Sequence, residues 1–209
     1  MAAKQNSMIP IVSKNFCSAS EVVLGVRMRP NVVNGGGFVV IDVTQKVVFR
    51  VDGCGVIGKK EQLLLRDGDG NELLLIRRKG GIVEALSLHK RWKGYSHDLE
   101  GSEKLVFSLK EPKNSYSCMG KNNRITVSVA SEYSAYGEFA ITGEFAARDC
   151  YIVNSNGSVI AQVGVWEEVE KMMACRDLYH VAVKPGIDQA FVFGVIAVLD
   201  YIYDGSTRC

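Results

Sequence analysis

Apolar residues follow one another without interruption from Ala190 to Leu199. No polar face recurs at helical spacing, so this segment has no side that is suited to water. Asp188 stands in the position of a helix N-cap, directly after the chain-breaking pair Pro185 and Gly186. Most strands are only about 5–6 residues long, so the length of the run favours a helix. The pattern therefore predicts a buried helix over residues 188–203.

Two other structures are compatible with parts of this pattern. The β-branched residues would also suit a buried strand, and a membrane span would also be apolar on all sides. A span needs about 20 apolar residues, however, and Asp200 interrupts the run. Gly194 costs roughly 1 kcal/mol against Ala in a helix, so we expect another backbone to approach closely there. The residues assigned structural roles in this central helix are Asp188, Ala190, Phe191, Gly194, Ile196 and Leu199.

The rest of the chain alternates between short apolar runs and turn sequences. Such turns between apolar runs predict hairpins over residues 38–51, 62–78 and 150–163. Many short strands followed by one helix predict a barrel or a sandwich, and an entirely apolar helix fits as the plug of a closed barrel. Further strands are predicted at residues 21–28, 85–88, 92–95, 104–109, 124–129, 139–145, 166–173 and 178–184.

Composition is that of one globular domain. The 209 residues are 47% apolar and 23% charged, with a formal net charge of only +2. This balance gives no overall field that would indicate a nucleic-acid partner. No linker divides the chain, so we predict a flexible lead-in over 1–15 and a single domain over 16–209. The six scattered cysteines and the absence of a signal-peptide pattern favour free thiols in a reducing, intracellular compartment.

Short motifs that could carry chemistry are better explained as turns. Residues 53–58 match G-x-G-x-x-G, but a strand rather than a helix follows, which favours a glycine-rich connector over a dinucleotide site. The series Asp67, Asp69, Asn71 lacks the Gly and Glu that a calcium loop needs next, which favours a hairpin turn. No Cys/His cluster has metal-ligand spacing and no local catalytic motif is present. We therefore expect no metal, no cofactor and no enzymatic activity, although a triad assembled from distant residues stays open.

Basic residues gather in two neighbouring segments, 77–79 and 89–93. If adjacent strands carry them, they form one positive face suited to the phosphates of lipid headgroups. Nucleic-acid phosphates would suit such a face as well. The alternative is a solvated sheet face with Trp92 in the core. The candidate lipid- or anion-binding residues are Arg77, Arg78, Lys79, Lys90, Arg91 and Lys93.

Several of these segments resemble the plant LURP-one-related proteins. The resemblance lies in residues 75–79 with 86–92 and in residues 183–200, supported by the strand at 38–42 and the turn at 69–71. It covers roughly residues 15–204. Lys90 departs from the pattern, because family members commonly carry an acidic residue there.

The resemblance implies a Tubby C-terminal-like fold, in which a closed antiparallel β-barrel of about twelve strands surrounds a hydrophobic C-terminal α-helix. This superfamily includes Tubby proteins, which bind phosphoinositides and regulate transcription from a membrane tether, and phospholipid scramblases. The resemblance thus implies a non-enzymatic regulatory or binding module with a role in plant defence. Its expected partners are phosphoinositide headgroups or an anionic membrane surface. Its expected location is cytoplasmic, peripheral at the plasma membrane, or nuclear. Binding of nucleic acid or of a protein partner is the alternative.

Overall fold

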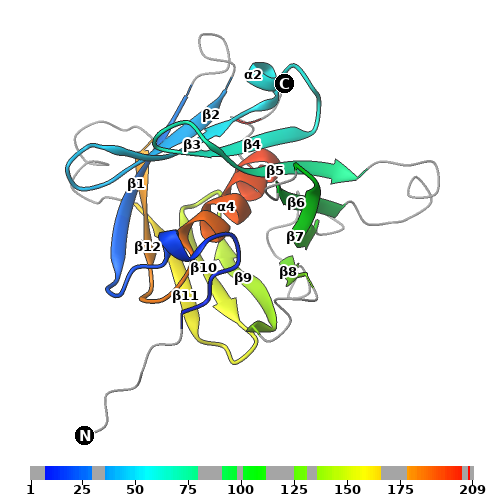
Figure 1. Cartoon of the computed structure of the whole chain (residues 1–209). Helices are drawn as coiled ribbons and strands as arrows, with labels where there is room; N and C mark the ends of the chain where they lie inside the picture. Colours follow the sequence, from blue (N-terminus) through cyan, green and yellow to red (C-terminus); the bar gives the residue numbers. More distant parts are fainter. Residues whose placement is uncertain are drawn as a thin grey trace, which may run out of the picture.

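Twelve antiparallel strands close into a barrel around one long helix, α4 (Gln189–Tyr203) (Figure 1). The computed structural model describes residues 8–29, 36–79, 91–97, 101–111, 125–130, 136–165, 178–203 and 207. Each strand pairs with its neighbours in the chain, and the barrel closes where the first strand pairs with the last. The predicted fold, mainly β with a closed barrel around a C-terminal helix, is confirmed.

The strands follow the predicted hairpins closely. They are β1 (Val22–Met28), β2 (Gly37–Ile41), β3 (Val47–Asp52), β4 (Gln62–Asp67), β5 (Glu72–Lys79), β6 (Arg91–His97), β7 (Glu103–Lys110), β8 (Ile125–Val129), β9 (Glu138–Glu144), β10 (Asp149–Asn154), β11 (Val159–Gly164) and β12 (Leu178–Val183). Two short helices precede β1 and β4, η1 (Lys14–Phe16) and α2 (Cys54–Ile57). The strands expected at 85–88 and 166–173 lie outside the described residues.

Two turn motifs have the local structure that their side chains favour. Asp67 accepts hydrogen bonds from the backbone N–H groups of Asp69, at 3.0 Å, and Asn71, at 2.8 Å, which closes the predicted turn between β4 and β5. The glycine-rich segment is not a plain connector, because the single helical turn α2 forms inside it. Gly58 ends that turn in the left-handed region with a φ of 71°.

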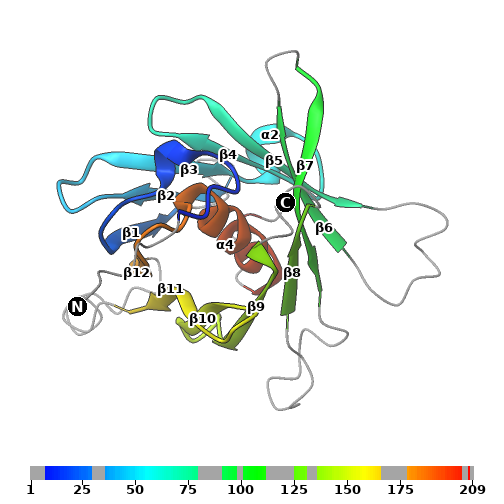
Figure 2. The same cartoon turned by 60° about the horizontal axis from the view of Figure 1, so that its bottom comes forward.

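The helix α4 fills the barrel (Figure 2). All six residues assigned to the central helix are buried, and Phe191 is fully inaccessible to solvent. Its ring lies 5.9 Å from the ring of Phe107 on β7 and 5.0 Å from that of Phe139 on β9. Because strands on every side surround α4, no part of its circumference needs a polar stripe. Within the part of the chain that the structure describes, no helix is long and apolar enough to cross a membrane.

One carboxylate fixes the start of α4. Asp188 caps the helix, since its Oδ1 accepts hydrogen bonds from the N–H groups of Ala190, at 2.9 Å, and Phe191, at 3.3 Å. Its Oδ2 accepts from three successive N–H groups of residues 11–13, at 3.0, 2.6 and 2.8 Å. Burial raises the pKa of Asp188, and the N–H donors of Ser13, Val12, Phe191 and Ala190 oppose that rise because they favour the ionised form.

The second half of the expected lead-in is therefore held against the barrel. Ile11 is 1% exposed and belongs to the core, and the N–H of Ile9 donates to the carbonyl of Gly186 at 2.8 Å. Residues 8–15, which were predicted as part of the lead-in, thus include several that contact the barrel. The physical reason is that Asp188, far away in the sequence, accepts their hydrogen bonds and the hydrophobic core takes up the side chain of Ile11.

Gly194 is crowded by side chains rather than by the expected backbone. A Cβ at this position would lie 2.8 Å from Cδ1 of Leu74 on β5 and 3.3 Å from the ring of Phe107. The glycine therefore lets the barrel wall approach the middle of α4.

We expect Gly194→Ala to lower the free energy of unfolding by about 1–2 kcal/mol in urea denaturation. Overpacking typically costs about 1–3 kcal/mol, and the better helix propensity of Ala returns up to about 1 kcal/mol. Leu74→Val removes the clashing Cδ1 atom, so Gly194→Ala should cost less in that background. An equal cost in both backgrounds would show that the Leu74 contact does not set the requirement for glycine.

Candidate anion-binding face

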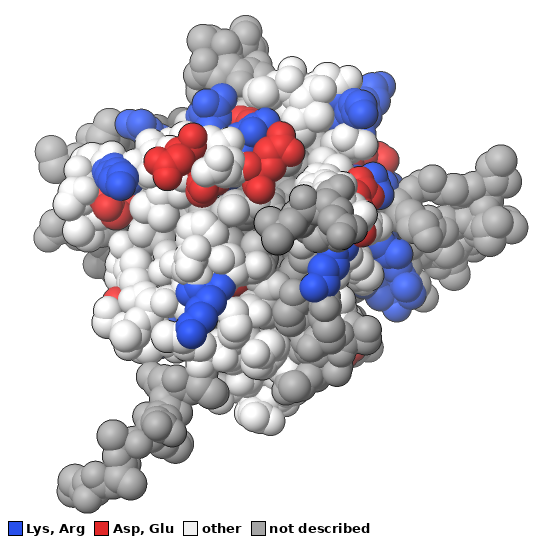
Figure 3. Space-filling model, in the orientation of Figure 1, with Lys and Arg blue, Asp and Glu red and all other residues white. Residues whose placement is uncertain are grey.

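Three adjacent strands bring basic residues into register on one side of the barrel. Across β5 and β6, Arg77 is opposite Lys93 and Lys79 is opposite Arg91. Across β6 and β7, Arg91 is opposite Lys110. These five positions, Arg77, Lys79, Arg91, Lys93 and Lys110, are called the basic face below. Basic side chains lie on the side of the surface that carries these strands (Figure 3).

Alternation along the strands separates these positions from the core. Trp92 and Gly94 of β6 are buried, whereas Arg91 is exposed and Lys93 is half-buried between them. Trp92 is 0% exposed, and its Nε1–H donates to Glu111 at 2.7 Å. Its ring lies 4.6 Å from that of Tyr201 on α4. The Trp92 side chain therefore belongs to the core rather than to the basic face.

Only part of the charge of the basic face is neutralised within the protein. Arg77 forms a two-pronged pair with Glu103, with N–O distances of 3.1 and 2.5 Å, and its guanidinium lies 4.5 Å from the centre of the Tyr95 ring. Among the described residues, Arg91, Lys93 and Lys110 form no ion pair. Like charges directly opposite each other destabilise a sheet, so this arrangement has a cost that a bound anion would remove.

The predicted set differs from the basic face at three points. Arg78 is opposite Trp92, is 18% exposed and pairs with Glu61, so it does not lie with the others. Lys90 lies outside the described residues. Lys110 was missed, because only the pairing of β6 with β7 brings it beside Arg91.

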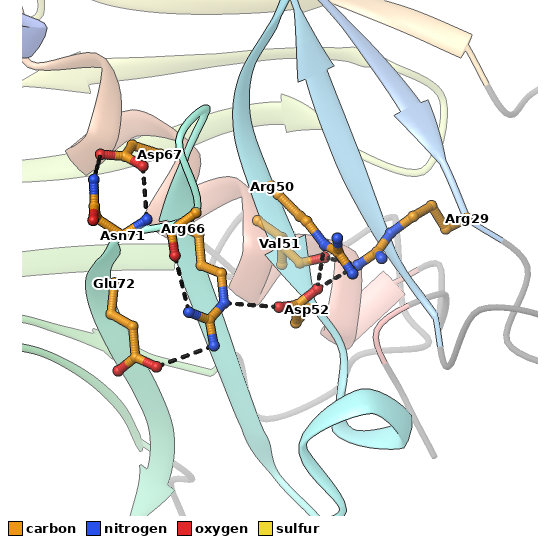
Figure 4. Close-up of polar contacts among 9 residues, drawn as sticks. Arg29, Arg50, Val51, Asp52, Arg66, Asp67, Asn71 and Glu72 are labelled. Atoms are coloured by element: carbon orange, nitrogen blue, oxygen red, sulfur yellow. Dashed lines mark hydrogen bonds and ion pairs between the residues drawn. The ribbon is translucent and has the colours of Figure 1, made fainter.

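A second charged cluster, also missed, is formed by residues of β3 and β4 and by Arg29, which directly follows β1. Asp52 is 5% exposed and accepts hydrogen bonds from Arg29 at 2.8 Å, Arg50 at 2.8 Å and Arg66 at 3.1 Å (Figure 4). Burial alone would raise the pKa of Asp52, but the guanidinium groups of Arg29 and Arg50 outweigh it and hold that pKa below its usual value.

This cluster links neighbouring strands of the barrel wall through ion pairs and hydrogen bonds. Arg50 is directly opposite Arg66 in the sheet, and Asp52 separates their charges. Arg66 is also bound to Glu72 at 3.0 Å and to the carbonyl of Gly70 at 3.0 Å, and Arg29 donates to the carbonyl of Val51 at 2.6 Å. Because Asp52 holds three guanidinium groups, the arrangement serves stability rather than anion binding.

The described cysteines include both free thiols and a residue that is disulfide-bonded. Cys17 and Cys150 are free thiols, as expected, but Cys54 is disulfide-bonded, against the expectation. Burial raises the pKa of Cys17 to about 11 and that of Cys150 to about 12, so neither thiol ionises readily near neutral pH. Among the described residues, no group of three or more His, Cys, Asp or Glu is placed to hold a metal ion.

Comparison with known proteins gives matches along almost the whole chain. A family model described as LURP-one-related matches residues 22–200. Protein LURP-one-related 6 of Arabidopsis thaliana is 54% identical over 202 residues, which cover 97% of this chain and all of the relative. Protein LURP-one-related 16 of the same plant is 50% identical over 219 residues, with both chains fully covered.

A solved structure supports the fold. An X-ray structure of a protein from Arabidopsis thaliana superposes with a TM-score of 0.65 at 19% identity, and the match covers 93% of this chain and 98% of the other. At this identity the similarity concerns the fold alone.

Proposed function

Because the chain belongs to the LURP-one-related family, we propose that it is a non-enzymatic module that binds phosphoinositide headgroups on an anionic membrane surface. The basic face makes the contact, with Arg91, Lys93 and Lys110 as its principal cations. The protein then lies peripherally at the membrane, and α4 stays inside the barrel. We also propose a role in plant defence, for which family membership is the sole support.

One observation carries the proposal: three cations with no ion pair in the described structure stand close together on neighbouring strands. An outer wall that carries such a group can meet several headgroup phosphates at once. Each Lys or Arg near an anionic leaflet contributes about 1 kcal/mol of binding free energy. In the free protein these like charges repel one another. Binding of an anion therefore removes this repulsion in addition to forming new contacts.

We expect the triple variant Arg91→Gln, Lys93→Gln, Lys110→Gln to bind vesicles with a few per cent phosphoinositide about a hundredfold more weakly than the wild type. Co-sedimentation at two salt concentrations measures this. Wild-type binding should weaken at the higher salt, because the contact is electrostatic and exposed. The melting temperature of the variant should stay equal to or above that of the wild type.

A matched control removes the same charge elsewhere. Lys14→Gln, Lys46→Gln, Lys184→Gln lowers the net charge equally at exposed positions outside the basic face. This control should retain most of the vesicle affinity. If the two triple variants lose affinity to the same extent, binding depends on net charge alone and the assignment of the basic face is wrong.

Nucleic-acid binding is the second candidate, because phosphate chemistry alone does not separate it from lipid binding. It predicts affinity for duplex DNA that falls steeply with salt and depends on the same three cations. The net charge of +2 favours the membrane, where a local face suffices. Duplex affinity no greater than that of a neutral control protein would remove this candidate.

A further inference from the structure

A groove of about 350 Å³ lies on the outer wall of the barrel, over β1 and between β12 and the turn that follows β2. Its lining is mainly aliphatic. It consists of Val23, Gly25, Arg27, Ile41, Asp42, Val43, Gln45 and Leu178. None of these residues belongs to the basic face, so the groove is a separate feature. Its volume is at the lower end of the range for small-molecule sites, about 300–1,000 Å³.

The floor of the groove exists because β1 has a glycine at its centre. Gly25 is paired with Ile41 on β2, and a Cβ added to it would lie 3.1 Å from Cγ1 of Ile41. A larger side chain would therefore fill the space. Val43 is 82% exposed and Val23 is 36% exposed, and both line the same depression. An apolar ligand would cover both.

The two charged residues of the groove differ in whether their side chains already form hydrogen bonds within the protein. Asp42 accepts hydrogen bonds from the N–H of Thr44 at 2.8 Å, the hydroxyl of Thr44 at 2.6 Å and the N–H of Lys46 at 3.0 Å. All three bonds go to Oδ1, so the turn uses one oxygen of this carboxylate. Arg27 is exposed and has no ion pair or side-chain hydrogen bond among the described residues. A guanidinium with free donors therefore adjoins an aliphatic surface.

We propose that this groove binds a small amphiphilic monocarboxylate, with the carboxylate on Arg27 and the aliphatic body over Gly25. A planar guanidinium matches a carboxylate through two parallel hydrogen bonds. The aliphatic lining of Val23, Ile41, Val43 and Leu178 matches a hydrocarbon chain. A neutral ligand would leave the guanidinium donors of Arg27 unused.

The test compares decanoate with decanol, both below their aggregation concentrations, in titrations followed by amide chemical shifts. The wild type should bind decanoate about tenfold more tightly than decanol, with shifts centred on Gly25, Ile41 and Leu178. Arg27→Gln should remove this preference and leave decanol binding unchanged. Gly25→Val should weaken both ligands, because it fills the floor.

The control variant is Arg91→Gln, which removes an exposed arginine from the basic face. It should keep the full preference for decanoate. The proposal is overturned if Arg27→Gln retains the preference, if Arg91→Gln abolishes it, or if the shifts centre on another part of the barrel. Since Arg27 is exposed, its replacement leaves the fold intact, and the test does not depend on the folding of Gly25→Val.

Discussion

Asp188→Asn is expected to lower the free energy of unfolding by about 3 kcal/mol, more than either Gly194→Ala or Asp52→Asn. Five backbone N–H groups converge on the Asp188 carboxylate. An amide has one oxygen and one NH₂ group, so at least two of these buried donors would face another donor. Each buried donor left without an acceptor costs about 1–3 kcal/mol. Relief from burying a charge offsets part of this, since burial raises the pKa of Asp188.

Urea denaturation measures the total loss of stability. Amide hydrogen exchange shows which of the two sets of N–H donors has lost its acceptor. Exchange of the amides of residues 11–13 should become fast in the variant. Asp188→Ser offers a second comparison, because a serine hydroxyl caps a helix well but is too small to serve both sets of donors. Its helix amides should stay protected while those of residues 11–13 do not. Asp69→Asn, at an exposed turn position, is the neutral control. A loss below about 1 kcal/mol in Asp188→Asn would contradict the interpretation.

Asp52→Asn is expected to cost about 2–3 kcal/mol at neutral pH. Removal of one partner from a buried ion pair typically costs about 3–5 kcal/mol. The partial exposure of Arg50 and Arg66 reduces this figure, because water can solvate their charges. Arg29 remains the main source of the loss, since its side chain is only 13% exposed. In the Arg29→Met background the same substitution should cost less.

The pH dependence of the Asp52 effect has a definite sign. The folded-state pKa of Asp52 is depressed, so its contribution is fully present above the unfolded-state pKa of about 3.9. It is lost as the pH falls through the lower folded-state pKa. The difference in unfolding free energy between wild type and Asp52→Asn should therefore shrink below about pH 4. A difference that stays constant down to about pH 2 would show that the carboxylate charge is not what stabilises the cluster.

Local signals were sufficient to predict much of this fold. The apolar run of α4 and its N-cap lie within a few residues of each other, and each hairpin carries its own turn residues. The hydrogen bonds from residues 11–13 to Asp188 span more than 170 positions and leave no local pattern in the sequence. The same holds for Asp52, whose partner Arg29 lies 23 positions away, directly after β1.

The candidate site was predicted in part for a similar reason. Arg77 and Arg78 were grouped because they are adjacent in the sequence. Adjacent side chains of a strand, however, point to opposite faces of the sheet. Applied strictly, that rule would have separated Arg78 from the set. Lys110 could be added only once the register of β6 against β7 was known. The basic face thus depends on which strands pair and in which register. The pattern of a single sequence gives little information about either.

The order of elements in the barrel also has a consequence for how the protein is made. The helix that fills the interior is the last element in the chain order, and β1 must pair with β12 to close the wall. While the chain emerges from the ribosome, the inner faces of β1–β11 lack the helix that covers them, and β1 and β11 lack their neighbour β12. A topology dominated by such distant contacts folds slowly and exposes apolar strands meanwhile. We therefore expect the nascent chain to rely on chaperones until α4 has been synthesised.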